Sequence, residues 1–308
     1  MRIAILLFVV FVLFFQFSLF GQGDRRFTSL EEASQQPEEV KWLDLDCEDF
    51  PLLPEKADQL INLESLYLTD CKLQQLPDGL GELESLGLLN VQDNKLSSLP
   101  ADMQNLKQLT VLNLRNNDFE ELPEWLSELY NLREIDLSGN ESLDIDQTLN
   151  TLSTVRKLDF LYLFELNLTK LPAQINELDL LEELHLSNNP NLDLSEAFKN
   201  LSKTPNLKIL VLSNNEITAI PKEIRMMKQL NGLVLDDNPD IKLESLNEYI
   251  KKLPELKVLL LRECSLSKIP ENLDGLSNLA VLELSNNHFS EAEQLRIKAL
   301  LPNTNVVF

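Results

Sequence analysis

The chain has few cysteines, few histidines and few basic residues, and each shortage limits its function. Its 3 cysteines cannot all pair within one chain, so disulfides are not expected to hold the protein together. Its 2 histidines, His185 and His288, lie far apart, and no serine–histidine–acid set can be assembled around them, so we do not expect an enzyme. Acidic residues outnumber basic ones by 50 to 27, which gives a net charge of −23. Unless this charge serves solubility alone, it excludes nucleic acid as a partner and favours a basic protein or peptide.

An apolar run of 18 residues, IAILLFVVFVLFFQFSLF, occupies positions 3–20 and follows the positive charge of Arg2. Small and polar residues come after it. This pattern predicts that residues 1–22 are a secretory signal peptide, cut near Gly21 or Gln22. The alternative is an uncleaved membrane anchor, because such a run approaches the length that spans a bilayer. Either way, the rest of the chain is expected to be secreted or in the cell envelope, outside the cytoplasm.

A motif recurs through nearly all of the chain after residue 39. Leucine or a substitute holds the first, fourth, sixth and eleventh places, asparagine holds the ninth, and Leu-Pro often holds the fourteenth and fifteenth. Residues 109–131, LTVLNLRNNDFEELPEWLSELYN, show it in full. Eleven units occupy residues 40–289, with steps of 23 or 26 residues. Because one unit cannot bury its own leucines, the recurrence predicts a stack of coils that cover one another.

This motif resembles that of the leucine-rich repeat family, in particular bacterial secreted or envelope members whose 23-residue repeats contain LPxxL. The resemblance implies an α/β right-handed solenoid, or horseshoe, with a parallel β-sheet on its concave face and short helices or irregular turns on its convex face. Residues 23–39 are then an N-terminal helical cap, with Thr28 or Ser29 capping the helix, and residues 290–308 are a C-terminal cap of helix and strand. The family usually recognises partners on the concave face without catalysis.

Three units of 26 residues, which begin at Leu132, Leu181 and Leu230, differ from the others. They lack the Leu-Pro pair and carry a longer amphipathic stretch in its place. This predicts about two turns of helix on the convex side of each.

The ninth-place asparagines are expected to point inward, where each amide can satisfy backbone groups of adjacent coils. Cys71 and Cys264 fill this place in two coils, so we interpret them as buried weak donors rather than reactive thiols or metal ligands. Cys47 stands one place before the ninth, and spacing alone does not decide whether it bridges to Cys71. The predicted asparagine ladder contains Asn94, Asn117, Asn140, Asn189, Asn215, Asn238 and Asn287.

The stretch DFLYLFEL, residues 159–166, is the main candidate for a binding site. In a strand that puts Leu161 and Leu163 into the core, the neighbouring aromatic side chains face outward. Polar residues at equivalent places of nearby coils would surround them. The candidate partner-binding residues on the concave face are Phe160, Tyr162, Phe164, Glu134, Asp136, Glu183, His185, Asn113, Arg115 and Tyr67.

Several partners suit rings beside carboxylates. Arginine or lysine can make cation–π contacts and ion pairs, which favours a protein or peptide with basic groups. A sugar can stack on the rings, so carbohydrate or cell-wall binding is an alternative, as is an acidic inhibitor of a basic enzyme. The rings can also pack across strands without any ligand. No cofactor or metal is expected, because the acidic turn at residues 236–240 lacks a calcium-binding loop. The oligomeric state is not indicated.

Overall fold

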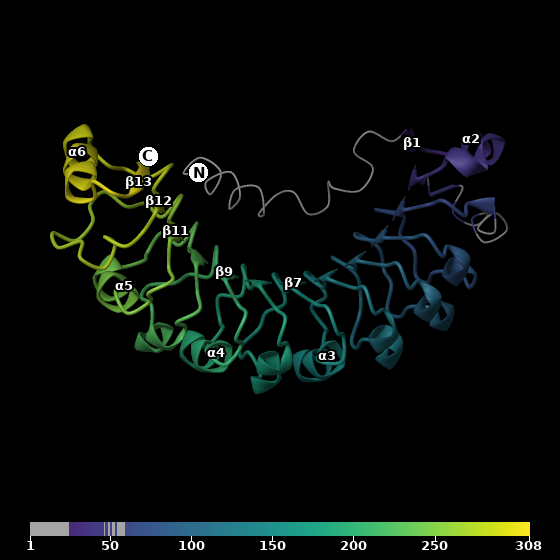
Figure 1. Cartoon of the computed structure of the whole chain (residues 1–308), viewed down its shortest axis with the longest axis horizontal. Helices are drawn as coiled ribbons and strands as arrows, with labels where there is room; N and C mark the ends of the chain where they lie inside the picture. The colour runs from purple at the N-terminus through teal and green to yellow at the C-terminus, as the bar shows by residue number, and fades with distance from the viewer. Residues whose placement is uncertain (1–24, 46, 49, 51–52, 54–58) are drawn as a thin grey trace. The chain divides into compact units, whose positions relative to one another are not determined.

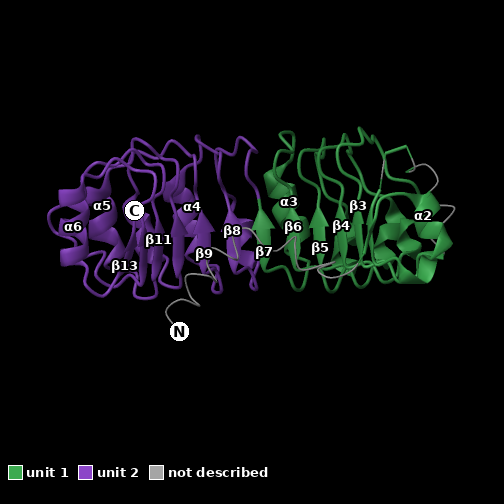
Figure 2. Ribbon diagram, turned by 90° about the horizontal axis from the view of Figure 1, so that it is seen from above, with its two compact units in different colours: residues 1–162 green, residues 163–308 purple. Residues whose placement is uncertain are grey.

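The computed structural model describes residues 25–45, 47–48, 50, 53 and 59–308. The predicted signal peptide or anchor, residues 1–22, lies outside them. The chain divides into two compact units, residues 1–162 and 163–308 (Figure 2). In each unit the strands lie side by side on one face of the coils and the helical segments lie on the opposite face (Figure 1). None of the described helices is long and apolar enough to cross a membrane.

The strands of unit 1 form a parallel sheet in chain order. Each strand from β2 onward has three residues and begins at the third place of a predicted unit, so equivalent places stand opposite each other, as Leu89 does with Leu112. The strands are β1 (Arg26–Phe27), β2 (Trp42–Asp44), β3 (Ser65–Tyr67), β4 (Leu88–Asn90), β5 (Val111–Asn113), β6 (Glu134–Asp136) and β7 (Phe160–Tyr162).

Unit 2 repeats this arrangement. Its strands also pair in parallel and in register, for example with Leu210 opposite Leu233. The strands are β8 (Glu183–His185), β9 (Ile209–Val211), β10 (Gly232–Val234), β11 (Val258–Leu260), β12 (Val281–Glu283) and β13 (Asn305–Val307).

The register follows from the leucines at the fourth and sixth places. Leu161 and Leu163 are fully buried, and so are Leu184 and Leu186. Burying one such side chain contributes roughly 1.5–3 kcal/mol, and a shift of one residue would turn the whole set to the other face. The alternation expected from the sequence is therefore confirmed.

Helical segments on the opposite face depend on coil length. The three coils of 26 residues carry α-helices of 8 residues, about two turns, as predicted: α3 (Ile145–Leu152), α4 (Leu194–Leu201) and α5 (Leu243–Ile250). Five of the 23-residue coils carry 3-10 turns, because they have fewer residues with which to return to the sheet. These turns are η5 (Leu80–Glu82), η6 (Ala101–Asn105), η7 (Glu124–Glu128), η8 (Ala173–Glu177) and η9 (Lys222–Met226). Parallel strands on one face and short helices or turns on the other are the predicted α/β solenoid architecture.

Both ends of the described chain add one strand and one helix to the repeats. The first helix, α2 (Leu30–Gln35), is capped by Ser29, whose Oγ accepts from the Glu32 amide at 3.3 Å. A 3-10 turn, η2 (Pro37–Glu39), follows it. Strand β1, which the sequence analysis did not predict, pairs with β2 ahead of the first coil. At the other end α6 (Glu291–Leu300) is capped by Ser290 and leads to β13.

One disulfide joins Cys47 to Cys71, which corrects two predictions. The bridge links the first coil to the second, with a sequence separation of 24 residues, so a disulfide does contribute to holding the chain together. Cys71 is therefore not a free thiol acting as a weak donor. Cys264 does have that role: it is buried and free, and its thiol donates to the carbonyls of Leu235 and Arg262 at 3.2 and 3.3 Å. Burial raises its pKa to about 11, which keeps the proton on the sulfur.

The ninth-place asparagines join each coil to the one before it. In unit 1, the side-chain oxygen of Asn94 accepts from the amides of Cys71 and Leu73, both at 3.0 Å. Its Nδ2 donates to the carbonyl of Leu68 at 2.7 Å. Asn238 in unit 2 makes the equivalent contacts with residues of the preceding coil. These are the bridging hydrogen bonds that the sequence led us to expect. The same contacts recur at Asn189 and Asn287, whereas Asn117, Asn140 and Asn215 each accept from one amide of the preceding coil and donate to one of its carbonyls.

Candidate binding surface

We keep the name concave face for the strand side of each unit, which carries the side chains at the third, fifth and seventh places of each coil. In unit 1 the pairing of β6 with β7 sets Glu134 opposite Phe160 and Asp136 opposite Tyr162. The structure therefore brings these four predicted site residues together. Phe160 and Tyr162 lie on the opposite side of their strand from Leu161, because side chains alternate along a strand.

These four side chains are less exposed than the sequence analysis expected. Glu134 is 1% exposed, Asp136 4% and Tyr162 8%, whereas Phe160 is half-buried. Strands stand about 4.8 Å apart, so side chains on neighbouring strands cover one another's stems. The expected patch of three open rings is therefore wrong for Tyr162. Phe164, the second residue of unit 2, is half-buried.

The predicted polar residues of unit 2 pair with each other. The Nε2 of His185 lies 2.6 Å from Oε1 of Glu183, within a single strand. Glu183 is 1% exposed and His185 8%. Residues two places apart on a strand point to the same face, so Glu183 and His185 can make this contact as neighbours.

Fifth-place polar groups also stabilise the ends of their own strands. In unit 1, Oδ1 of Asn113 accepts from the backbone amide of Arg115 at 2.9 Å. Oδ1 of Asp136 accepts from the amide of Ser138 at the same distance. In each case the acceptor lies two residues before the donor, where the chain leaves the strand. Asn113 and Asp136 therefore have a structural role in addition to any contact with a partner.

Tyr67 belongs to an aromatic and charged cluster that the sequence analysis missed. Its ring centroid is 6.0 Å from that of Trp42, the third-place residue of the preceding coil. The Arg26 guanidinium lies 5.8 Å from the Trp42 ring centroid and forms an ion pair with Asp44. Burial and the Asp44 carboxylate raise the pKa of Tyr67. Trp42 holds a third place, and Asp44 and Tyr67 hold fifth places, so the repeat puts all three on the same face. This shared face was the signal available in the sequence.

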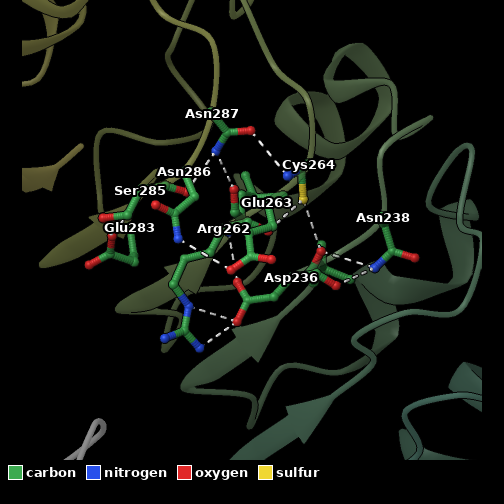
Figure 3. Close-up of polar contacts among 11 residues, drawn as sticks. Asp236, Asn238, Arg262, Glu263, Cys264, Glu283, Ser285, Asn286 and Asn287 are labelled. Carbon is green, nitrogen blue, oxygen red and sulfur yellow. Dashed lines mark hydrogen bonds and ion pairs between the residues drawn. The ribbon is translucent and has the colours of Figure 1, made fainter.

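A second arginine is held on the concave face of unit 2 (Figure 3). The Arg262 side chain donates to Oδ2 of Asp236 from Nε at 2.9 Å and from Nη2 at 2.6 Å, and its backbone amide donates to Oδ1 at 2.8 Å. The hydrogen bond to Asp236 raises the pKa of Arg262. Asp236 belongs to the acidic turn at residues 236–240, which was considered as a calcium site. Its carboxylate is instead bound by Arg262. In the part of the chain that the structure describes, no three acidic, histidine or cysteine side chains form a metal-binding group.

An exposed acidic rim runs beside the concave face, at the eighth place of the coils. From the second coil onward the eighth residue has a positive φ of 50–71°, which asparagine, aspartate and glycine tolerate best. Asparagines of the rim donate to the carboxylates of the preceding coil, as Asn116 does to Asp93 at 2.7 Å and Asn188 to Glu165 at 2.8 Å. We define the acidic rim as Asp70 and Asp93 in unit 1 and Glu165, Asp237 and Glu263 in unit 2.

This rim was not predicted, because the eighth place is not part of the repeat motif. The recurring Asp-Asn and Asn-Asn pairs at the eighth and ninth places were the signal. Carboxylates at the eighth place are exposed, whereas Glu134, Asp136 and Glu183 on the strands are buried. The exposed carboxylates of this surface therefore lie on the rim, whereas Asp44 and Glu283 on the strands are half-buried.

Comparison with known proteins agrees with the repeat. Residues 40–163 match the model of the leucine-rich repeat region, and residues 206–227 match that of the leucine-rich repeat. Both segments are therefore similar to leucine-rich repeats. Among solved structures, a leucine-rich repeat protein of Leptospira interrogans is 24% identical, with 92% of this chain and 100% of that chain covered and a TM-score of 0.33. A search of curated proteins finds no match.

Proposed function

We propose that this protein is a non-catalytic recognition module that acts outside the cytoplasm and binds a protein or peptide with basic groups on its concave face. Leucine-rich repeats generally serve as protein-interaction modules, and stacked coils present an extended surface to a partner. The observation that carries the proposal is the exposed acidic rim beside the strands of each unit. A net charge of −23 adds a long-range field that draws basic partners towards it.

Two arginines of the chain itself illustrate the proposed contact. Arg26 is held by a strand carboxylate and lies over an aromatic ring in unit 1, and Arg262 is held by a carboxylate of the preceding coil in unit 2. A partner's arginine can use the same chemistry in either unit, with the half-buried ring of Phe160 in unit 1 or of Phe164 in unit 2 as an apolar contact and the acidic rim of that unit as the source of charge. Cation–π contacts and charge-assisted hydrogen bonds favour arginine at such places.

A location outside the cytoplasm is supported by two observations. The bridge between Cys47 and Cys71 is the kind that persists in oxidising compartments and is rare in the cytosol. The apolar run at residues 3–20 has the form of an export signal or anchor. Together with the LPxxL-containing repeats, they favour a secreted or envelope protein of bacterial type.

Carbohydrate binding is a second candidate, because Trp42 and Tyr67 form an aromatic pair with an interplanar angle of 43° and Asp44 lies on the same strand as Trp42. Rings of this kind can stack on a sugar while a carboxylate accepts from its hydroxyls. Arg26 covers part of this cluster, which favours the basic partner over the sugar.

Calorimetric titration of the full-length protein with nona-arginine, at low and high salt, tests the proposal. Replacing both Phe160 and Phe164 with serine should weaken binding by about tenfold or more, because aromatic anchors dominate such interfaces. Tyr162 is retained, since its burial could make its loss a folding defect. The control replaces three exposed apolar residues away from the strands, Ile61, Leu180 and Met226, with serine.

The proposal would be supported if binding weakens at high salt, is lost in the aromatic variant and is retained in the control. Nona-arginine binding that is equal in both variants would refute the aromatic contact. Salt-insensitive binding to neutral oligosaccharides, with none to nona-arginine, would establish the carbohydrate alternative instead.

A further inference from the structure

Unit 2, every residue of which the structure describes, contains a groove of about 500 Å³ between the loops that follow β8 and β9. One wall consists of residues 189–190 and 192–195, and the other of residues 215–221. The two coils differ in length, 26 residues for the first and 23 for the second, so their loops diverge after the ninth-place asparagines. Beyond the groove the coils meet again, where α4 packs against η9.

The two walls are open towards each other but paired on their far sides. The amide of Asp193 donates to the carbonyl of Thr169 in the preceding coil at 3.0 Å, and the amide of Lys242 in the following coil donates to that of Thr218 at 2.9 Å. Within unit 2 no hydrogen bond joins residues 190–193 to residues 216–219. In unit 1, where two coils of 23 residues meet, the amide of Asp118 donates to the carbonyl of Leu96 at 2.9 Å and closes the equivalent gap. The groove therefore has an unpaired backbone edge on each side.

The chemistry of the lining is apolar and negative. Leu192, Ile217 and Ile220 line the groove and are buried within the coils. Two exposed carboxylates, Asp193 and Glu216, also line it, and no lysine or arginine does. Asp193 uses Oδ1 to cap α4, which leaves Oδ2 available. Glu216 makes no ion pair in unit 2.

We propose that this groove binds an extended peptide segment that carries lysine or arginine. The backbone of such a segment would pair with the open edges, as in recognition by strand addition. Four residues on each wall correspond to about 13 Å of extended chain. A basic side chain of the segment would contact Asp193 and Glu216. This site is separate from the concave face, because it is formed by loop residues beyond the seventh place.

Hydrogen exchange of the full-length protein, with and without an acetylated and amidated Thr-Lys octapeptide as the probe, tests the proposal. The amides of Glu216 and Ala219 have no hydrogen-bond partner among the residues that the structure describes, so they should exchange fast in the free protein and become protected with the peptide. Ala219→Trp should fill the groove and weaken the peptide at least tenfold. Glu216→Gln should weaken it by about threefold, as expected for one exposed ion pair.

Matched controls use Glu121, an exposed carboxylate that occupies the place of Ala219 in a 23-residue coil of unit 1. On the side that corresponds to the groove, its loop is already paired, since the Asp118 amide donates to the Leu96 carbonyl at 2.9 Å. Glu121→Trp and Glu121→Gln should therefore leave peptide affinity within about twofold of the original.

Protection at residues 216–219 that Ala219→Trp removes would support the groove. Absence of that protection, or equal affinity in Ala219→Trp and Glu121→Trp, would overturn it. Protection restricted to the strands would overturn the groove while leaving the proposed concave-face function intact, because the serine variant at Phe160 and Phe164 tests that function separately.

Discussion

Replacing Asn238 with alanine should destabilise unit 2 by about 4 kcal/mol, because it leaves two buried amides without an acceptor at about 1–3 kcal/mol each. The Oδ1 of Asn238 accepts from the amides of Asn215 at 3.1 Å and Ile217 at 2.9 Å. Its Nδ2 donates to three carbonyls, and the side chain is fully buried. No water can replace these contacts without a cavity to hold it.

The assay is urea unfolding, combined with native-state hydrogen exchange to locate the effect. Besides the lower stability, the amides of Asn215 and Ile217 should exchange at least about tenfold faster. The control is Asp237→Gly at the neighbouring eighth place, which removes an exposed carboxylate and keeps a residue that tolerates the φ of 56°. It should cost less than about 1 kcal/mol. A loss below about 1 kcal/mol in Asn238→Ala, equal to the control, would refute the bridging role of the ladder.

Three further predictions concern stability. Replacing Cys47 and Cys71 with serine should lower the stability of unit 1 by about 3 kcal/mol, the effect of opening a loop of 24 residues, and reduction should do so only in the original protein. Gly139→Ala should destabilise unit 1 by about 1–2 kcal/mol in thermal unfolding, because its φ is +71°, and the side chain of Asn116 in the preceding coil would have to move away from the added Cβ. The Arg296 side chain lowers the pKa of Glu293. That pair therefore stabilises unit 2 above the usual glutamate pKa, and the effect disappears as the pH falls through the lowered one. Melting temperatures of Glu293→Gln and the original should converge at low pH, and a constant difference would contradict the pair's contribution.

The recurrence of leucines predicted the strands because it depends only on which residues are buried. Leu161 and Leu163 must be inside, and this determines which residues are on the other face. Coil length likewise predicted α3, α4 and α5, because three additional residues must be accommodated away from the sheet. The inward asparagines were predictable for a similar reason, since a polar residue recurring among leucines must have buried partners.

Features that depend on the environment of single residues were not predictable. The Cys47–Cys71 bridge depends on how the first coil meets the second, and Cys47 is one place out of phase with the repeat. The burial of Tyr162 and Glu134 depends on how closely neighbouring side chains pack. The groove beside Glu216 arises because adjacent coils differ in length. When repeats are aligned by their motif, this difference is only a gap and does not indicate a groove.

The central claim, that the acidic rim draws a basic partner to the concave face, is tested most directly by neutralising the rim. One variant changes all five rim carboxylates to their amides, which preserves the acceptor that Asn116 uses on Asp93. Its control changes five exposed glutamates outside the concave face, so both variants have the same charge, −23 + 5 = −18. The control positions are Glu121, Glu124, Glu141, Glu196 and Glu244.

Nona-arginine affinity should fall in the rim variant by about thirtyfold, or about 2 kcal/mol, if each exposed pair contributes about 0.4 kcal/mol. The control should lose no more than about threefold through the weaker overall field. Equal losses in the two variants would show that net charge alone attracts the peptide and would contradict a binding surface beside the strands.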